Sequence, residues 1–148
     1  MSVRVQTEDF DIGAEIAALR KGNTKIGAIA SFIGLVRDIN EGDDVSVMTL
    51  EHYPGMTEKA ISAIMEQARA RWTLIDVLVI HRFGKLAVGA PIMMVATAAV
   101  HRGDAFLAAD FLMDYLKSRA PFWKKEIGVD GEIWVASKAQ DEAALKRW

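Results

Sequence analysis

Residues 117–126 form the part of the sequence whose residue types are best suited to chemistry. They read Lys-Ser-Arg-Ala-Pro-Phe-Trp-Lys-Lys-Glu, so four cations and two large aromatic residues surround a proline. A lysine can bind phosphate as a point charge, and neighbouring cations or burial can lower its pKa until it acts as an acid, a base or a nucleophile. Lys117 and Lys124 are the candidates for such a role. The ordinary alternative is that Lys117 stabilises a helix end while Lys124 and Lys125 are solvated.

Two further positions at the ends of apolar segments could bind an anion. His101 and Arg102 follow an apolar strand and precede a helix, where side chains and free backbone amides often meet an anion. Arg37 ends the predicted strand 26–36, in which Gly34 would let a ligand approach closely. A histidine that donates to a backbone carbonyl and an arginine at a loop edge are the ordinary alternatives. The pattern indicates a local anion site without naming its ligand.

Other chemical templates are missing or weak in this sequence. The pair His81-Arg82 ends another strand and the turn at residues 52–55 leads into a helix, so both are interpreted as scaffold. The sequence has no nucleophile elbow, P-loop, dinucleotide fingerprint or H-E-x-x-H motif, and its three histidines are too scattered to suggest a metal site. It has no cysteine, which excludes a thiolate nucleophile. We therefore expect no metal and no cofactor, and any reacting sulfur must come from another molecule.

Composition predicts one domain, residues 1–148, that buries a hydrophobic core. The chain is 51% hydrophobic and 26% charged, and its net charge of -2 with a pI near 5.9 argues against nucleic acid or an anionic membrane as a partner. The longest apolar run, 87–100, is interrupted by Gly89 and Pro91 and is shorter than the ~20 residues that cross a bilayer. The first residues lack the apolar stretch of a signal peptide, so we expect a cytoplasmic protein.

The elements that must position the candidate residues are strands and about three main helices. Their irregular alternation favours an α+β fold with a partly antiparallel, mixed sheet. Alternating or continuous apolar patterns predict strands at 3–6, 26–36, 45–53, 74–83, 92–100 and 132–135. Helical spacing predicts helices between Asp11 and Gly22, from Thr57 to Trp72, and from Gly103 to near Pro121, the last with apolar positions at Phe106, Ala109, Leu112, Met113 and Leu116. Residues 122–128 should leave the third helix in a new direction, and a charged tail should follow the last strand.

In their order and spacing, several segments together resemble the large subunit of molybdopterin synthase. These segments are Phe-x-Gly-x-Val-Arg at 32–37, Leu-Glu-His-Tyr-Pro-Gly-Met at 50–56, His81-Arg82, His101-Arg102, Met-Asp-Tyr-Leu-Lys at 113–117, and Ala-Pro-Phe-Trp-Lys-Lys-Glu at 120–126. The resemblance extends from about residue 32 to residue 134. It implies an α/β-hammerhead-type fold and a homodimer that carries one small ubiquitin-like subunit at each end of a heterotetramer.

The same resemblance implies a role in molybdenum cofactor biosynthesis. The small subunit would carry sulfur as a thiocarboxylate on its C-terminal Gly-Gly tail, which would enter a pocket of the large subunit. Two rounds of transfer to cyclic pyranopterin monophosphate would then form the dithiolene of molybdopterin. A chain without cysteine fits a reaction in which the partner supplies the sulfur.

Matching motifs also imply roles for individual residues. Lys117 and Lys124 would be catalytic, handling the reactive carbonyl of the tail and moving protons as the cyclic phosphate opens. Leu35 stands where a more polar residue is expected, so only its backbone could make a polar contact, and Lys138 could serve as a basic residue after the last strand. The pocket would lie close to the dimer interface, where both chains could contribute. The implied substrate-binding residues are Leu35, Val36, Arg37, His101, Arg102, Lys117, Lys124, Lys125 and Glu126.

Two other functions remain open on the sequence. One is a different phosphate-handling enzyme that uses the same lysines on another anionic metabolite, and failure to bind the pterin would favour it. The other is a noncatalytic scaffold that keeps the dimer and the groove for the tail. The presence of both Lys117 and Lys124 argues against the scaffold, because docking alone would not require both.

Overall fold

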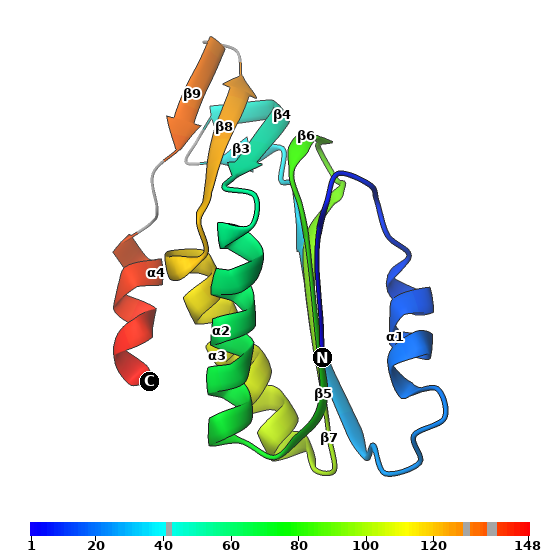
Figure 1. The fold of residues 1–148 in the computed structure, drawn as a ribbon. Coiled ribbons are helices and arrows are strands. Elements are labelled where there is room, and N and C mark those ends of the chain that lie inside the picture. The colour runs from blue at the N-terminus through cyan, green and yellow to red at the C-terminus, as the bar shows by residue number, and fades with distance from the viewer. Residues whose placement is uncertain (41–42, 129–130, 136–138) are drawn as a thin grey trace.

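The structure, a computed structural model, describes residues 1–40, 43–128, 131–135 and 139–148, with residues 39–40, 43–46, 123–128, 131–135 and 139 described by their backbone (Figure 1). The strands are β1 (Ser2–Gln6), β2 (Ala28–Leu35), β3 (Ile39–Asn40), β4 (Asp43–His52), β5 (Leu74–Arg82), β6 (Gly84–Ala87), β7 (Pro91–Ala99), β8 (Phe122–Gly128) and β9 (Gly131–Val135). The helices are α1 (Ile12–Arg20), α2 (Met56–Arg71), α3 (Arg102–Arg119) and α4 (Ala139–Ala144), followed by a 3-10 turn at Leu145–Arg147.

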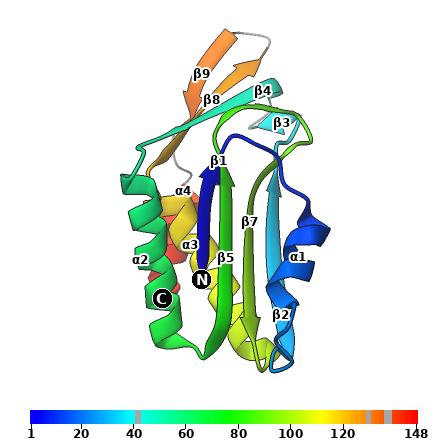
Figure 2. The same ribbon diagram turned by 45° about the vertical axis from the view of Figure 1, so that its right-hand side comes forward.

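The first sheet has the strand order β1-β5-β7-β2, as Figure 2 shows. β1 and β5 run parallel, whereas β7 is antiparallel to both β5 and β2. Helices α2 and α3 cover one face of this sheet and α1 covers the other (Figure 1). Because both faces are covered, β5 and β7 are buried along most of their length, which explains their nearly continuous apolar sequences.

The two hydrophobic clusters of the first sheet follow the alternation of side chains along its strands. Val77 and Val79 of β5 pack with α2 and α3, while Leu78 and Ile80 pack with α1. Successive residues of a strand face opposite sides of the sheet, so a single strand serves both clusters. The odd-numbered residues near the end of β5 therefore face the helix that carries Lys117.

A second sheet lies beyond the ends of α2 and α3 (Figure 1). Its order is β3-β4-β8-β9, and β6 also pairs with β4. All of these pairings are antiparallel. Val36, which follows β2, packs with Met48 and Leu50 of β4 and with Leu86 of β6, so a small apolar cluster joins the two sheets. The combination of helices with parallel and antiparallel strands confirms the predicted α+β class and mixed sheet.

The local signals in the sequence explain where several elements begin and approach each other. The Asp11 carboxylate accepts a hydrogen bond from the Ala14 N–H at 2.9 Å, which caps α1 as predicted. Ahead of α2, the Glu58 side chain accepts from the Gly55 N–H at 2.7 Å, and Gly55 has a φ of +84°. A Cβ on Gly27 would lie 2.1 Å from the Val100 carbonyl oxygen, so only glycine lets β2 begin this close to the end of β7.

The predicted strands and the three predicted helices are confirmed, with shifts of a few residues at their ends. The structure adds β6, the short β3, the strand β8 where only a change of direction was predicted, and α4 in the predicted charged tail. Phe106 is 65% exposed, although it was one of the apolar positions of the third helix. The buried face of α3 is rotated by about one residue from the predicted face, because the helix packs against both the sheet and α2. Its buried residues are Ala105, Ala108, Phe111, Leu112 and Leu116.

No helix among the described residues is both long and apolar enough to span a bilayer.

Candidate active site

Lys117 lies in the last turn of α3, on the exposed side of the helix. Its neighbour Leu116 is only 7% exposed and packs into the core between α3 and the first sheet, so the helix is held firmly under the lysine. The helix ends at Arg119, and the chain turns into β8 through the extended Ala120 and then Pro121. A cation in the last turn also interacts favourably with the negative end of the helix dipole. Lys117 is therefore an exposed cation on a rigid support.

Lys124 lies in β8, the strand that runs between β4 and β9. Its backbone is opposite Leu50 of β4 and Val135 of β9. Lys125 and Glu126 follow in the same strand, and the side chains of all three lie outside the described part of the chain. Lys138 also lies outside the described residues. The structure thus places the backbone of the predicted 124–126 segment in the centre of the second sheet.

Leu35, Val36 and Arg37 lie where β2 ends, next to the junction of the two sheets. Leu35 is 51% exposed and Arg37 is exposed, whereas Val36 is only 4% exposed. The Val36 N–H donates to the Ala90 carbonyl oxygen at 3.0 Å, and its carbonyl oxygen accepts from the Gly89 N–H at 2.7 Å. Val36 also packs against Leu50, the residue paired with Lys124. The end of β2 is therefore fixed close to the strand that carries Lys124.

His101 and Arg102 lie at the other end of the first sheet. His101 is the exposed N-cap of α3 and Arg102 is the exposed first residue of that helix. In the β2–β7 pair, Leu35 is opposite Pro91 and Ala28 is opposite Ala99, so the end that leads to Arg37 is far from the end that leads to His101 (Figure 2). Seven steps along a strand correspond to roughly 20 Å. One chain does not bring these predicted residues together.

The structure places a buried histidine close to Lys117, although this histidine was interpreted as scaffold. His81 is 9% exposed, and its ring stacks on the ring of Phe122 at 3.7 Å between centroids and 15° between planes. Burial lowers the pKa of His81 to about 4, against the opposing effect of its hydrogen bond to the Arg82 carbonyl oxygen. The nearby charges of Lys117 and His52 lower this pKa further. The signal in the sequence was the His-Arg pair at a strand end, which occurs at both 81–82 and 101–102.

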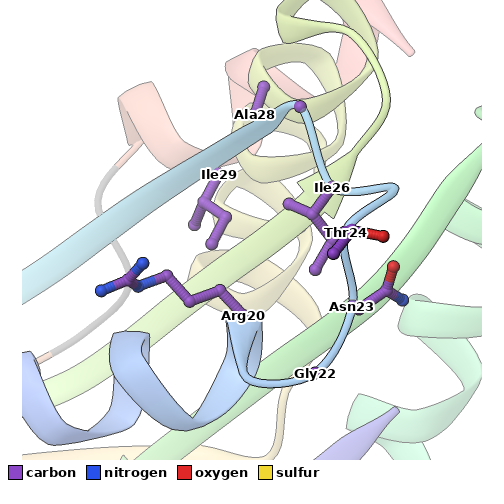
Figure 3. Close-up of a pocket in the computed structure, with 8 residues that line it drawn as sticks. Arg20, Gly22, Asn23, Thr24, Ile26, Ala28 and Ile29 are labelled. Carbon is purple, nitrogen blue, oxygen red and sulfur yellow. The ribbon is translucent and has the colours of Figure 1, made fainter.

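Two surface hollows do not coincide with the candidate residues. One of about 450 Å³ lies where the chain passes from α1 to β2, with Arg20, Asn23 and Thr24 at its rim (Figure 3). Another of about 470 Å³ lies beside α4 and is lined by Arg119, Glu142, Ala143, Leu145 and Lys146. Within the part of the chain that the structure describes, no group of three or more His, Cys, Asp or Glu residues is arranged to hold a metal ion.

Comparisons with known proteins match nearly the whole chain. Residues 5–119 match the family model described as MoaE protein. A molybdopterin synthase catalytic subunit from Ralstonia nicotianae is 62% identical over 147 residues, which cover 99% of this chain and 84% of that protein. A molybdopterin synthase catalytic subunit from Cereibacter sphaeroides is 61% identical over 148 residues, which cover 100% of both chains.

The fold agrees with a solved structure of the same kind. The molybdopterin biosynthesis MoaE protein from Burkholderia ambifaria superimposes with a TM-score of 0.85 at 56% identity, covering 99% of this chain and 97% of that one. This likeness agrees with the hammerhead-type fold that the motifs implied. The sequence and structure matches confirm the resemblance found in the motifs, and the chain belongs to the MoaE protein family.

Proposed function

We propose that the chain is the catalytic subunit of a molybdopterin synthase and acts as a sulfurtransferase. The observation that carries this proposal is the match over the whole chain, at 61% identity, to a relative named molybdopterin synthase catalytic subunit. The sulfur donor is a small ubiquitin-like subunit with a thiocarboxylated C-terminal Gly-Gly tail, and the acceptor is cyclic pyranopterin monophosphate. The reaction takes place in the cytoplasm, in a protein whose residues 1–148 form one domain.

The edge of the first sheet supports binding of an extended tail. β2 is the last strand in its sheet, and among the described residues only β7 pairs with it. Leu35 and Phe32 on this strand are 51% and 41% exposed. An exposed strand edge offers backbone donors and acceptors to an extended peptide, and exposed apolar side chains add contact area. A Gly-Gly tail that pairs parallel to β2 would carry its C-terminus toward the end of β2, where Leu35 and Arg37 lie.

The two lysines perform the chemistry at that end of the sheet. In each round, the tail sulfur forms a bond with a carbon of the pterin substrate while a carbon–oxygen bond at that carbon breaks. The oxygen leaves with the phosphate when the cyclic ester opens in one round, and as water in the other. A water molecule then cleaves the bond between sulfur and the acyl carbon, and the tail leaves as a carboxylate. Lys117 and Lys124 stabilise negative charge on the acyl oxygen and donate a proton to the oxygen released when the cyclic phosphate opens. The exposed position of Lys117 on the rigid end of α3 supports this role.

The phosphate and the pterin are held by cations from two chains. Arg37 presents an exposed guanidinium, whose planar fork suits phosphate oxygens. His101 and Arg102 lie roughly 20 Å away along the same strand pair, too far to reach one ligand together with Arg37. A second copy of the chain supplies His101 and Arg102 to the site that contains Arg37 and the lysines. This separation supports a homodimer inside a heterotetramer.

A reconstituted assay tests the proposal. The purified chain is mixed with a thiocarboxylated small subunit and cyclic pyranopterin monophosphate, and product is detected after oxidation to a fluorescent pterin. Wild type should form product, and Lys117→Ala should fold and bind the small subunit but lose nearly all product. Lys21→Ala is the matched control, because Lys21 is also an exposed lysine at a helix end, on the opposite face of the first sheet.

Two results would count against the proposal. If wild type forms no product with a small subunit verified in another synthase, the reaction is wrong and the phosphate-enzyme alternative is tested next. If Lys117→Ala is as active as Lys21→Ala, the reaction stands but Lys117 is not catalytic.

A further inference from the structure

Phe122 lies at the corner of the chain that joins the two proposed catalytic lysines. It is the first residue of β8, five positions after Lys117 and two before Lys124. The helix that carries Lys117 packs on the first sheet, whereas Lys124 lies in the second sheet. The distance between the two lysines therefore depends on how this corner is held between the sheets.

His81 holds Phe122 from the first sheet. Their rings are stacked at 3.7 Å with 15° between the planes. A carbonyl oxygen can only accept, so the 2.9 Å contact between His81 Nδ1 and the Arg82 carbonyl oxygen means that Nδ1–H donates. This bond sets the orientation of the ring and its tautomer. The ring under Phe122 is consequently a fixed surface.

Arg82 makes this support rigid by tying together the ends of three strands. Its guanidinium donates to the Thr7 carbonyl oxygen at 3.0 and 3.2 Å, just after β1, and to the Pro91 carbonyl oxygen of β7 at 2.9 Å. The same Arg82 supplies the carbonyl that orients His81. The sheet end beneath the stack is therefore cross-linked on both sides of β5.

His52 holds Phe122 from the second sheet. Its ring centroid is 5.8 Å from that of Phe122, and the two residues are partners in the β4–β8 ladder. The Thr57 hydroxyl gives its hydrogen to the Tyr53 carbonyl oxygen at 2.9 Å, so its oxygen accepts from His52 Nδ1–H at 3.1 Å. Phe122 therefore contacts two oriented histidine rings, one from each sheet.

The charge state of His81 suits this position. Burial keeps the pKa of His81 near 4, so the ring is neutral at pH 7 and adds no second positive charge beside Lys117. A cationic side chain here would repel the lysine and would be costly to bury. A neutral aromatic ring provides contact area without disturbing the charge of the site.

We propose that His81 is a positioning residue, which through its stack on Phe122 sets the placement of Lys117 relative to Lys124. The proposal rests on the function proposed above for these lysines. It concerns the ring of His81 and not its hydrogen bond alone, because the ring is the part in contact with the corner.

Two variants separate the ring from the hydrogen bond. His81→Phe keeps an aromatic ring over Phe122 but cannot donate to the Arg82 carbonyl oxygen, whereas His81→Asn can donate to that oxygen but has no ring. Val77→Ala is the matched control, because Val77 is fully buried in the same strand and faces the same side of the sheet, four residues away. For each protein, kcat, KM, urea unfolding and amide hydrogen exchange of residues 117–126 are measured.

Relative to wild type, His81→Asn should lower kcat about tenfold or more, since small misplacements of reacting groups have effects of this size. Its KM should stay within about twofold, because Arg37, His101 and Arg102, the cations that hold the phosphate and the pterin, are unchanged. Exchange should become faster within 117–126. His81→Phe should keep most of the kcat, and Val77→Ala should lose stability with unchanged kcat.

Several outcomes would overturn the proposal. The first is an unchanged kcat in His81→Asn, and the second is a loss of kcat in His81→Phe as large as that in His81→Asn. The third is a clear loss of kcat in Val77→Ala, because it would show that lower stability alone reduces turnover. Absence of product from the wild type would refute the proposed function itself. In that case exchange still decides the positioning claim, and unchanged exchange of residues 117–126 in His81→Asn would refute it.

Discussion

Arg37 and His101 lie at opposite ends of the antiparallel pair formed by β2 and β7. Leu35 is opposite Pro91 near the first residue, and Ala28 is opposite Ala99 near the second. A strand of this length separates the two side chains by roughly 20 Å, which exceeds the size of a pterin phosphate. If both residues serve one substrate, they must come from different chains.

Complementation between two inactive variants tests this arrangement. At a substrate concentration well below the KM of either variant, Arg37→Ala and His101→Ala should each be nearly inactive alone. After the two are mixed and allowed to exchange subunits, a mixed dimer keeps one site with both residues intact. Random exchange should restore about a quarter of the wild-type activity, because half of the dimers are mixed and each has one intact site of two. If the mixture forms no more product than the separate variants do, the two residues do not come from different chains to one site.

Arg37→Ala should weaken substrate binding more than it lowers the rate at saturation. The proposed contact is between an exposed guanidinium and phosphate, so the apparent KM should rise while kcat changes less. Added salt should weaken binding further in the wild type, because the contact is ionic and solvent-exposed. Steady-state kinetics at two ionic strengths measure both effects, with Arg37→Lys as the control that keeps the charge but loses the fork. An unchanged apparent affinity in Arg37→Ala would remove Arg37 from the phosphate site.

The stability of the protein should fall as the pH is lowered from about 6.5 to about 4, partly because of His81. Burial lowers the pKa of His81 from 6.5 to about 4 in the folded chain, so the unfolded chain takes up this proton first. Stability from this group is complete above pH 6.5 and is lost toward pH 4, by up to about 3 kcal/mol. Urea unfolding of wild type and His81→Phe across this range isolates the effect, since other groups titrate in both proteins. If the free energy of unfolding falls equally with pH in the two proteins, His81 is not held neutral.

Asp114→Ala should loosen the C-terminal residues from α3. The Asp114 carboxylate accepts hydrogen bonds from Arg147 at 2.6 and 2.9 Å and from the Trp148 indole N–H, and its side chain is 13% exposed. The Trp148 ring packs edge-on against Phe111. In Asp114→Ala, Arg147 and the Trp148 indole N–H lose their shared acceptor, which should lower the free energy of unfolding by about 1–3 kcal/mol. Asp110→Ala is the control, because the half-exposed Asp110 forms a 2.8 Å ion pair with the half-exposed Arg147. Losing this exposed pair should cost less than about 1 kcal/mol. Equal losses from the two variants would contradict this account.

Elements with a strong local signal could be predicted from the sequence. Asp11 marks the start of α1 because its carboxylate caps a free amide three residues later, and Pro121 marks the end of α3 because proline cannot continue a helix. The buried strands β5 and β7 are visible as two apolar runs separated by Gly84, Gly89 and Pro91. The strand β8 was not predicted, because its sequence is rich in charge and it becomes a strand only by pairing with β4 and β9.

The candidate residues at 35–37, 101–102 and 117–126 could be identified from residue types and motif order, since the resemblance depends on sequence alone. The role proposed for His81 could not, because neither burial nor the stack on Phe122 is encoded near position 81; both arise where β5 meets a strand that begins forty-one residues later.

By itself, the sequence determined the family, the α+β class and the residue types available for anion chemistry, because these depend on local patterns and on motif order. Only the tertiary structure decided which of those residues share a site. Antiparallel pairing of β2 with β7 sends Arg37 and His101 to opposite ends of the sheet. Packing of α3 brings Lys117 near His81, and the turn at Pro121 brings Phe122 onto the ring of that histidine. Distances between residues remote in the sequence follow from strand register and helix packing, which no single segment specifies.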